Sequence, residues 1–246
     1  MKAFFKQLFI QLRMDLRDKG TLLVFYIVPL GFYAVMGAVF ASVTPEMKQT
    51  LSAAMAIFAV TMGALIGIPP TLVKMREANI LRAYRVNGIP GVSVLLSIGI
   101  SALIHLGIAA IIIAASAPAL FGAEAPQNMG GFACVLFAFL FCSVALGLLI
   151  GVSAKSQPTA MMLSQAVFLP SLMLSGIMFP ANLLPDVLLY LGRILPSTHA
   201  MLAFSGFAYG LTVESGALPA LLIVLGTGIA AAVVTAWQFG RITRLS

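Results

Sequence analysis

The sequence predicts an all-α polytopic membrane protein with six transmembrane helices, and three observations support this prediction. First, 61% of the 246 residues are hydrophobic and only 9% are charged, whereas a soluble domain carries charge on about a quarter of its residues. Second, the apolar residues form separate runs, each long enough to cross the hydrocarbon core of a bilayer as a helix. Third, the basic residues gather between alternate runs, as they do in loops on the cytoplasmic side of a membrane.

We expect the whole chain to form a single transmembrane domain. The predicted crossings are residues 22–42, 51–72, 91–117, 132–152, 160–179 and 218–239. Pro69 and Pro70 are expected to break or kink the second crossing, because proline cannot donate a backbone hydrogen bond. In the fourth crossing, Ser143, Gly147 and Gly151 recur at four-residue intervals. This stripe of small residues predicts close helix packing, either within one subunit or between two.

The basic residues determine the predicted orientation. The positive-inside rule places 12 of the 14 Lys and Arg residues in the cytoplasm: Lys2, Lys6, Arg13, Arg17, Lys19, Lys74, Arg76, Arg82, Arg85, Lys155, Arg241 and Arg244. Only Lys48 and Arg193 fall outside. We therefore expect both termini in the cytoplasm and the chain in a cell membrane, the cytoplasmic membrane of a bacterium. The same rule explains the net charge of +7, so nucleic acid is not an expected partner.

Residues 1–20 predict an amphipathic helix on the inner leaflet of the bilayer. Their apolar side chains recur at helical spacing, with most of the cations elsewhere on the helix: Phe5, Leu8, Phe9, Leu12 and Leu16. The alternative is an ordinary basic leader before the first crossing. A cleavable signal is not expected, because the first apolar run begins only after these residues and is as long as a full crossing.

The predicted crossings lack the groups that catalysts and ion-coupled carriers use. They contain no Asp, Glu, Lys or Arg, and His105 is their only ionisable side chain apart from cysteine and tyrosine. We expect His105 to be neutral and bonded to a neighbouring helix, with a proton site as the alternative. The chain also lacks GxSxG, HExxH and GxxxxGK[ST] motifs. It is therefore not expected to be an enzyme, and no metal or cofactor site is predicted.

The two cysteines are predicted to be free. Cys134 and Cys142 lie in one helical run, where eight residues separate them by about 12 Å, too far for a disulfide. We expect both to be small buried side chains.

The longest charged interruption is the loop of residues 73–90, between the second and third crossings. Its charged residues are Lys74, Arg76, Glu77, Arg82 and Arg85. Ile80, Leu81 and Tyr84 share one face of a short helix, which predicts a surface that docks on a partner. The alternative is a solvated loop that only sets the topology.

Residues 180–212, on the outside, are too apolar for a free loop. Pro180, Pro185 and Pro196 divide them into short pieces. Two half-helices that dip back into the outer leaflet would satisfy their backbone groups, provided that protein shields the irregular backbone. The alternative is a partly buried surface hairpin without a gating role.

Two separated stretches resemble the membrane permeases of type-2 ABC exporters, which move drugs, polysaccharides and lipids outward. Arg76-Glu77 and the following ILRAYRVNGIP are similar to the arginine-glutamate segment of the family's coupling helix. The later stretch is similar to the family's signature and comprises Ser175-Gly176-Ile177, Phe179-Pro180, Leu184-Pro185 and Leu195-Pro196. The chain has Ala78-Asn79 where the family commonly has Gly-Thr, and Asn87-Gly88-Ile89-Pro90 where it commonly has Thr-Pro.

The resemblance implies the transmembrane subunit of an ATP-driven exporter that moves a hydrophobic or amphipathic substrate by alternating access. Separate ATP-binding cassette subunits would bind ATP and Mg, and a second permease, identical or homologous, would complete the path. Contact with the ATPase would involve Arg76, Glu77, Leu81, Arg82, Tyr84 and Arg85. The outer gate would consist of Ser175, Gly176, Phe179 and Pro180. The substrate path would include Met55, Phe58, Met62, Phe168 and Met173.

Two other classes remain open at this stage. An ion-coupled secondary carrier would depend on His105, and a non-transporting assembly factor would use the charged loop only to bind partners. The methionines and phenylalanines of the implied substrate path also have an alternative role. They would face lipid or fill packing gaps, as such side chains commonly do in membrane helices.

Overall fold

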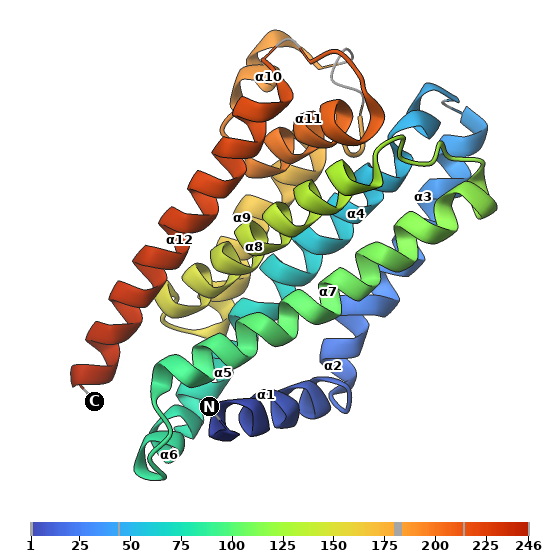
Figure 1. Cartoon of the computed structure of the whole chain (residues 1–246). Coiled ribbons are helices and arrows are strands. Elements are labelled where there is room, and N and C mark those ends of the chain that lie inside the picture. The colour runs from blue at the N-terminus through green and yellow to red at the C-terminus, as the bar shows by residue number, and fades with distance from the viewer. Residues whose placement is uncertain (1, 44, 180–183, 214, 246) are drawn as a thin grey trace.

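The computed structural model describes residues 2–43, 45–179, 184–213 and 215–245. Side chains are described within these ranges except at residues 2–3, 43, 45–46, 85 and 242–245. The described chain is a bundle of helices without strands (Figure 1). The predicted all-α fold is confirmed.

The helices follow the order of the predicted crossings. The first half comprises α1 (Lys2–Asp15), α2 (Lys19–Leu22), η1 (Leu23–Ile27), α3 (Val28–Val43), η2 (Pro45–Gln49), α4 (Leu51–Met62), η3 (Gly63–Gly67), α5 (Ile68–Glu77) and α6 (Ile80–Val86). The second half comprises α7 (Gly91–Phe121), α8 (Met129–Ser153), α9 (Gln157–Leu174), α10 (Asp186–Gly192), α11 (Pro196–Tyr209) and α12 (Ala217–Leu245).

Within the described residues, five helices are long and apolar enough to cross a membrane: Lys19–Ser42, Leu51–Glu77, Gly91–Phe121, Met129–Ser153 and Ala217–Arg241. α9 takes the place of the predicted fifth crossing but is not one of these five, since it ends at Leu174 and carries Gln157 and Gln165. A sixth candidate span is the pair of α10 and α11, which is bent by 91°. The bend agrees with the half-helices that the prolines predict.

The helix Leu51–Glu77 occupies the centre of the bundle. Of its most apolar window, 83% is buried, against 22% for Lys19–Ser42 and 28% for Ala217–Arg241. Of the break or kink expected at Pro69 and Pro70, the break does not occur, because the helix continues through them. η3 is a π-helical turn, and Pro69 and Pro70 follow it in the first turn of α5. The π-helical turn accommodates the missing proline donors, and the helix continues to Glu77.

The small-residue stripe of α8 packs against this central helix. A Cβ atom added to Gly147 would collide with the carbonyl oxygen of Ala64 in η3, and one added to Gly151 would lie 3.1 Å from the Cα atom of Pro69. Of the two interpretations that the spacing permits, the structure therefore supports packing within one subunit.

The structure shows the hydrogen-bond partner of His105 and the exposure of the two cysteines. The hydroxyl oxygen of Tyr26, on η1, lies 2.7 Å from Nδ1 of His105, so the expected bond to a neighbouring helix is confirmed. Both cysteines are free, as predicted. Cys142 is buried, whereas Cys134 is exposed, which corrects the expectation that both are buried.

Candidate functional site

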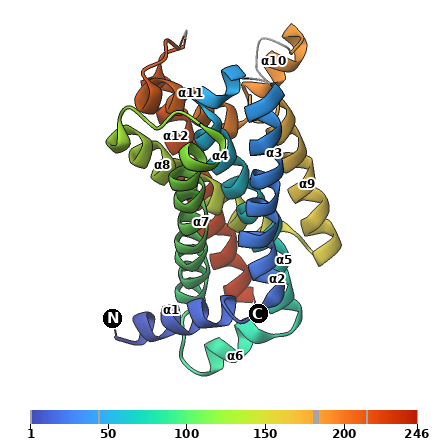
Figure 2. The same cartoon turned by 90° about the vertical axis from the view of Figure 1, so that its right-hand side faces the viewer.

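The two ends of the bundle differ in structure. α1 lies across one end, close to α6, and the N- and C-terminal ends of the chain are found there as well (Figure 2). α10 and α11 lie at the opposite end. The predicted coupling loop and the predicted outer gate are therefore far apart.

α6 is the short helix predicted in the charged loop. It follows Ala78 and Asn79, and Asn79 has a φ of 58°, a left-handed conformation that asparagine tolerates better than most residues do. The exporter family that the sequence resembles commonly has threonine at this position. The left-handed conformation is the structural reason why asparagine suits it here. On the other side, Gly88 has a φ of 74° and returns the chain to α7.

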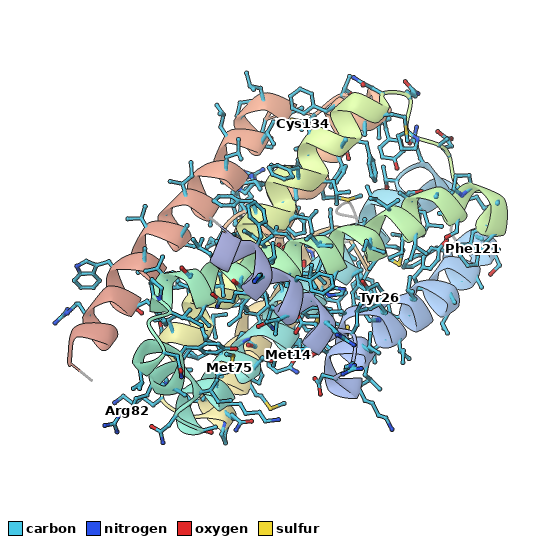
Figure 3. All side chains as sticks on the ribbon, turned by 60° about the horizontal axis from the view of Figure 1, so that its bottom comes forward. Met14, Tyr26, Met75, Arg82, Phe121 and Cys134 are labelled. Carbon is cyan, nitrogen blue, oxygen red and sulfur yellow. The ribbon has the colours of Figure 1, made fainter. Side chains whose placement is uncertain are left out.

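The side chains of α6 divide into two faces. Leu81 and Tyr84 are partly buried against the hydrophobic core. Ile80 and Val86 are 39% and 80% exposed, and Arg82 extends away from the ribbon (Figure 3). The predicted apolar face is therefore split, because Ile80 faces outward while its two partners face the core. The side chain of Arg85, also assigned to coupling, lies outside the described residues.

Arg76 and Glu77 belong to the end of α5 and not to the loop. Arg76 donates hydrogen bonds to the carbonyl oxygens of Val152, over 3.3 Å, and of Ala154. Glu77 accepts a hydrogen bond of 2.8 Å from Nε2 of Gln157. Both side chains thus bind the connection between α8 and α9, a contact that the sequence did not predict.

α1 is attached to the bundle by a carboxylate. Asp15 accepts hydrogen bonds from Ser101 on α7, over 2.5 Å, and from Gln11, over 2.8 Å. The outer side of α1 exposes Phe5, Phe9 and Ile10, which suits the predicted position at a lipid surface. Next to α1, Asp18 caps α2 by accepting hydrogen bonds from the backbone and the hydroxyl of Thr21.

The two aspartates are expected to give opposite pH dependences. Burial raises the pKa of Asp15 above its ordinary value of 3.8 despite its hydrogen bonds. Its contribution to stability is present below the ordinary value and is lost as pH rises through the raised pKa. The hydrogen bonds from Thr21 lower the pKa of Asp18, so its contribution is present above 3.8 and is lost as pH falls through the lowered pKa.

Asp15→Asn should therefore raise Tm relative to the natural chain at about pH 7, and the gain should shrink toward pH 3. Asp18→Asn, the matched control, should lower Tm at about pH 7, with a loss that also shrinks in acid. Thermal unfolding of the detergent-solubilised chain measures both. A destabilised Asp15→Asn chain at neutral pH would contradict this account.

The predicted gate residues are brought together with α11. Ser175 is buried, and its Oγ lies 2.6 Å from Oγ of Ser197. Thr198 donates a hydrogen bond to the carbonyl oxygen of Gly192 and lies 3.1 Å from Oγ of Ser175. Gly176 follows with a φ of 76°, so the chain turns sharply after α9.

Phe179 is 41% exposed, and Pro180 lies outside the described residues. The gate is therefore described as far as Phe179, and its gating role stays a prediction.

Three of the five predicted path residues, Met55, Phe58 and Met62, lie on the central helix, and Phe168 and Met173 lie on α9. Phe58 on α4 has its ring centroid 6.0 Å from that of Phe168 on α9 and stacks on Phe32 at 4.0 Å. Met55 is fully buried, Met62 is half-buried, and Met173 is 50% exposed on α9. A water-sized cavity between the described helices is lined by Thr61, Ser143, Ser171 and Ser197 together with apolar residues.

The described chain thus combines helices long and apolar enough to span a membrane, a helix across one end of the bundle and a bent helix pair at the other end. The sequence model of the ABC-2 type transporter family matches residues 4–209, and the chain belongs to this family. Comparison with curated protein sequences gives no match. The chain is thus a transmembrane permease subunit that works with ATP-binding cassette subunits in a membrane.

Proposed function

We propose that this chain is the permease of an exporter that moves a hydrophobic or amphipathic molecule, such as a drug or a lipid, out of the cell. ATP and Mg are bound by separate ATPase subunits. A second permease, identical or homologous, completes the path. The complex lies in the cytoplasmic membrane of a bacterium, with the end that carries α1 and α6 in the cytoplasm.

The observation that carries this proposal is the continuous helix Leu51–Glu77. It joins the charged end of the bundle to the apolar side chains of the predicted path, and it is the most buried of the five long apolar helices among the described residues. A displacement of α6 therefore reaches Phe58 through a single packed helix. Packed helices respond to such a displacement by switching between discrete arrangements, as alternating access requires.

The apolar surface of α9 supports a path between two permeases. Met162, Leu169 and Met173 are 65%, 50% and 50% exposed on α9. Two cavities between the described helices, of about 10 and 20 Å³, hold no more than a water-sized molecule, which favours a path formed with a second surface. Flexible methionines suit apolar cargo of varied shape.

An ATP-driven uptake assay tests the function. Inside-out vesicles that contain the permease and its ATPase should accumulate an amphipathic dye after ATP addition, whereas vesicles with a hydrolysis-deficient ATPase should not. Dye uptake driven by a pH gradient without ATP, and abolished by His105→Phe, would instead favour the ion-coupled carrier. ATPase binding without transport of any tested amphiphile would favour an assembly factor.

The orientation has its own test, motivated by the uneven distribution of basic residues. In a Cys134→Ser chain, which removes the exposed natural thiol, single cysteines replace one residue at a time. Gln127→Cys, in the exposed α7–α8 connection, should react with an impermeant thiol reagent in intact cells. Lys74→Cys and Gln157→Cys should react only after the membrane is opened. Reaction at position 74 from outside would refute the proposed orientation.

A further inference from the structure

The connection between α8 and α9 is packed onto the end of α5 by apolar contacts. Ala154 is 1% exposed, and together with Val73 on α5 and Ala160 on α9 it forms a small buried cluster separate from the main core. Each of the three residues comes from a different segment. The cluster therefore fixes where the connection lies on α5.

Arg76 adds polar contacts to the same connection. The last carbonyl groups of a helix lack partners within the helix, and they carry the negative end of its dipole. Arg76 donates to the carbonyl oxygens of Val152 and Ala154, at the end of α8. Its planar guanidinium serves both oxygens at once, which the single ammonium of lysine does not do in the same geometry.

Glu77 holds the next helix in the chain. Its carboxylate accepts the hydrogen bond from Gln157, the first residue of α9, and Ser156 caps α9 by accepting from the backbone of Thr159. Ser153, at the end of α8, donates a further hydrogen bond of 2.8 Å to Gln238 of α12. Adjacent residues of α5 thus bind the end of one helix and the start of another.

We propose that Arg76 and Glu77 are positioning residues that clamp the α8–α9 connection to α5, so that α6 and the start of α9 move as one unit. This inference rests on the proposed function for its consequence in transport. α9 ends at Leu174, directly before Ser175 and Gly176, so the clamp links the ATPase side of the chain to the outer segment through α9 as well as through the central helix. The ATPase itself binds the exposed side of α6, which carries Ile80, Arg82 and Val86.

Hydrogen exchange of the purified chain tests the clamp without any transport assay. Arg76→Met should speed exchange of the backbone amides of Ala154 and Ala160, which donate to Ile150 and Ser156, by about tenfold or more, because the connection opens locally once its carbonyls lose their donor. The matched control is Arg82→Met, which removes an exposed cation from α6 and should leave this exchange unchanged. Unchanged exchange in Arg76→Met would overturn the clamp, whatever the protein transports.

The complex with the ATPase tests the consequence. Arg76→Met should retain the ATPase on co-purification but move several-fold less substrate for each ATP hydrolysed, whereas Arg82→Met should lose the ATPase. Loss of the ATPase from both variants alike would make Arg76 a docking residue and overturn its positioning role. Failure of the unaltered complex to transport would count against the proposed function alone, because the exchange measurement still decides the clamp.

If Arg76→Met folds poorly, a covalent bridge between α5 and α9 provides a second test of the clamp. In a Cys134→Ser chain, Glu77→Cys and Gln157→Cys are joined by a short bifunctional thiol reagent. The bridge replaces the hydrogen bond between these positions, so transport per ATP should match that of the unaltered complex and exceed that of the unbridged double variant. Transport that is lost on bridging would show that α5 and α9 must separate during the cycle, which would overturn the proposal.

Discussion

Replacing Gly147 with valine is expected to prevent the chain from folding into a stable bundle. Gly147 lies where α8 crosses the π-helical turn η3, and any Cβ atom there would collide with the carbonyl oxygen of Ala64. A backbone oxygen cannot rotate away as a side chain can, so the two helices would have to separate. We expect a loss of about 3 kcal/mol or more in stability, since overpacking a well-packed core typically costs about 1 to 3 kcal/mol.

The matched control is Gly226→Val in α12. Gly226 is also a helical glycine, but no atom lies within 4 Å of an added Cβ. This variant should show only the small effect of a β-branched residue on an exposed helix surface. Size-exclusion chromatography and thermal unfolding in detergent compare the two chains. Equal Tm values would contradict the close approach of α8 and η3.

Five of the six predicted crossings correspond to long apolar helices among the described residues, because the bilayer imposes a simple rule on composition. A run of about 20 apolar residues between polar turns is sufficient evidence for a spanning helix. The detailed boundaries follow other physics. The second helix continues past Pro69 and Pro70 because a π-helical turn precedes them, and the sequence carries no sign of that turn.

The candidate site was predictable only where the side chains have a local pattern. The spacing of Leu81 and Tyr84 predicted the helix α6, and the stripe at Ser143, Gly147 and Gly151 predicted a close contact. The bonds of Arg76 go instead to backbone carbonyls 76 and 78 residues further along the chain. Every residue has a carbonyl group, so such a contact leaves no trace in the sequence.

The attachment of α1 gave a weak signal that the sequence interpretation passed over. Asp15 is an acidic residue in a segment otherwise rich in cations, and the helical pattern did not explain its presence. Its partner Ser101 lies 86 residues away on α7. Asp15 thus anchors the end of α1 to α7 across a large separation in the chain.

Gly176→Leu is expected to lower ATP-driven transport several-fold while the chain still folds and still binds its ATPase, since a bias of about 1.4 kcal/mol between two conformations changes their ratio about tenfold. The positive φ of 76° means that a side chain strains this turn by about 1 kcal/mol. The nearest atom to an added Cβ is Cγ of Met201 at 3.8 Å, an ordinary contact. The strain relaxes by shifting the turn, which displaces Ser175 from Ser197 and changes the path from α9 to the outer segment.

Gly122→Leu separates this effect from backbone strain alone. Gly122 ends α7 with a φ of 61°, and no atom lies within 4 Å of an added Cβ, so its substitution has a similar strain without involving the predicted gate. Tm should fall by a similar amount in both variants, but only Gly176→Leu should lose transport in inside-out vesicles. Normal transport by Gly176→Leu would remove the gate assignment. Equal loss in both variants would mean that strain at the outer end of the bundle is enough to stop the cycle, wherever it lies.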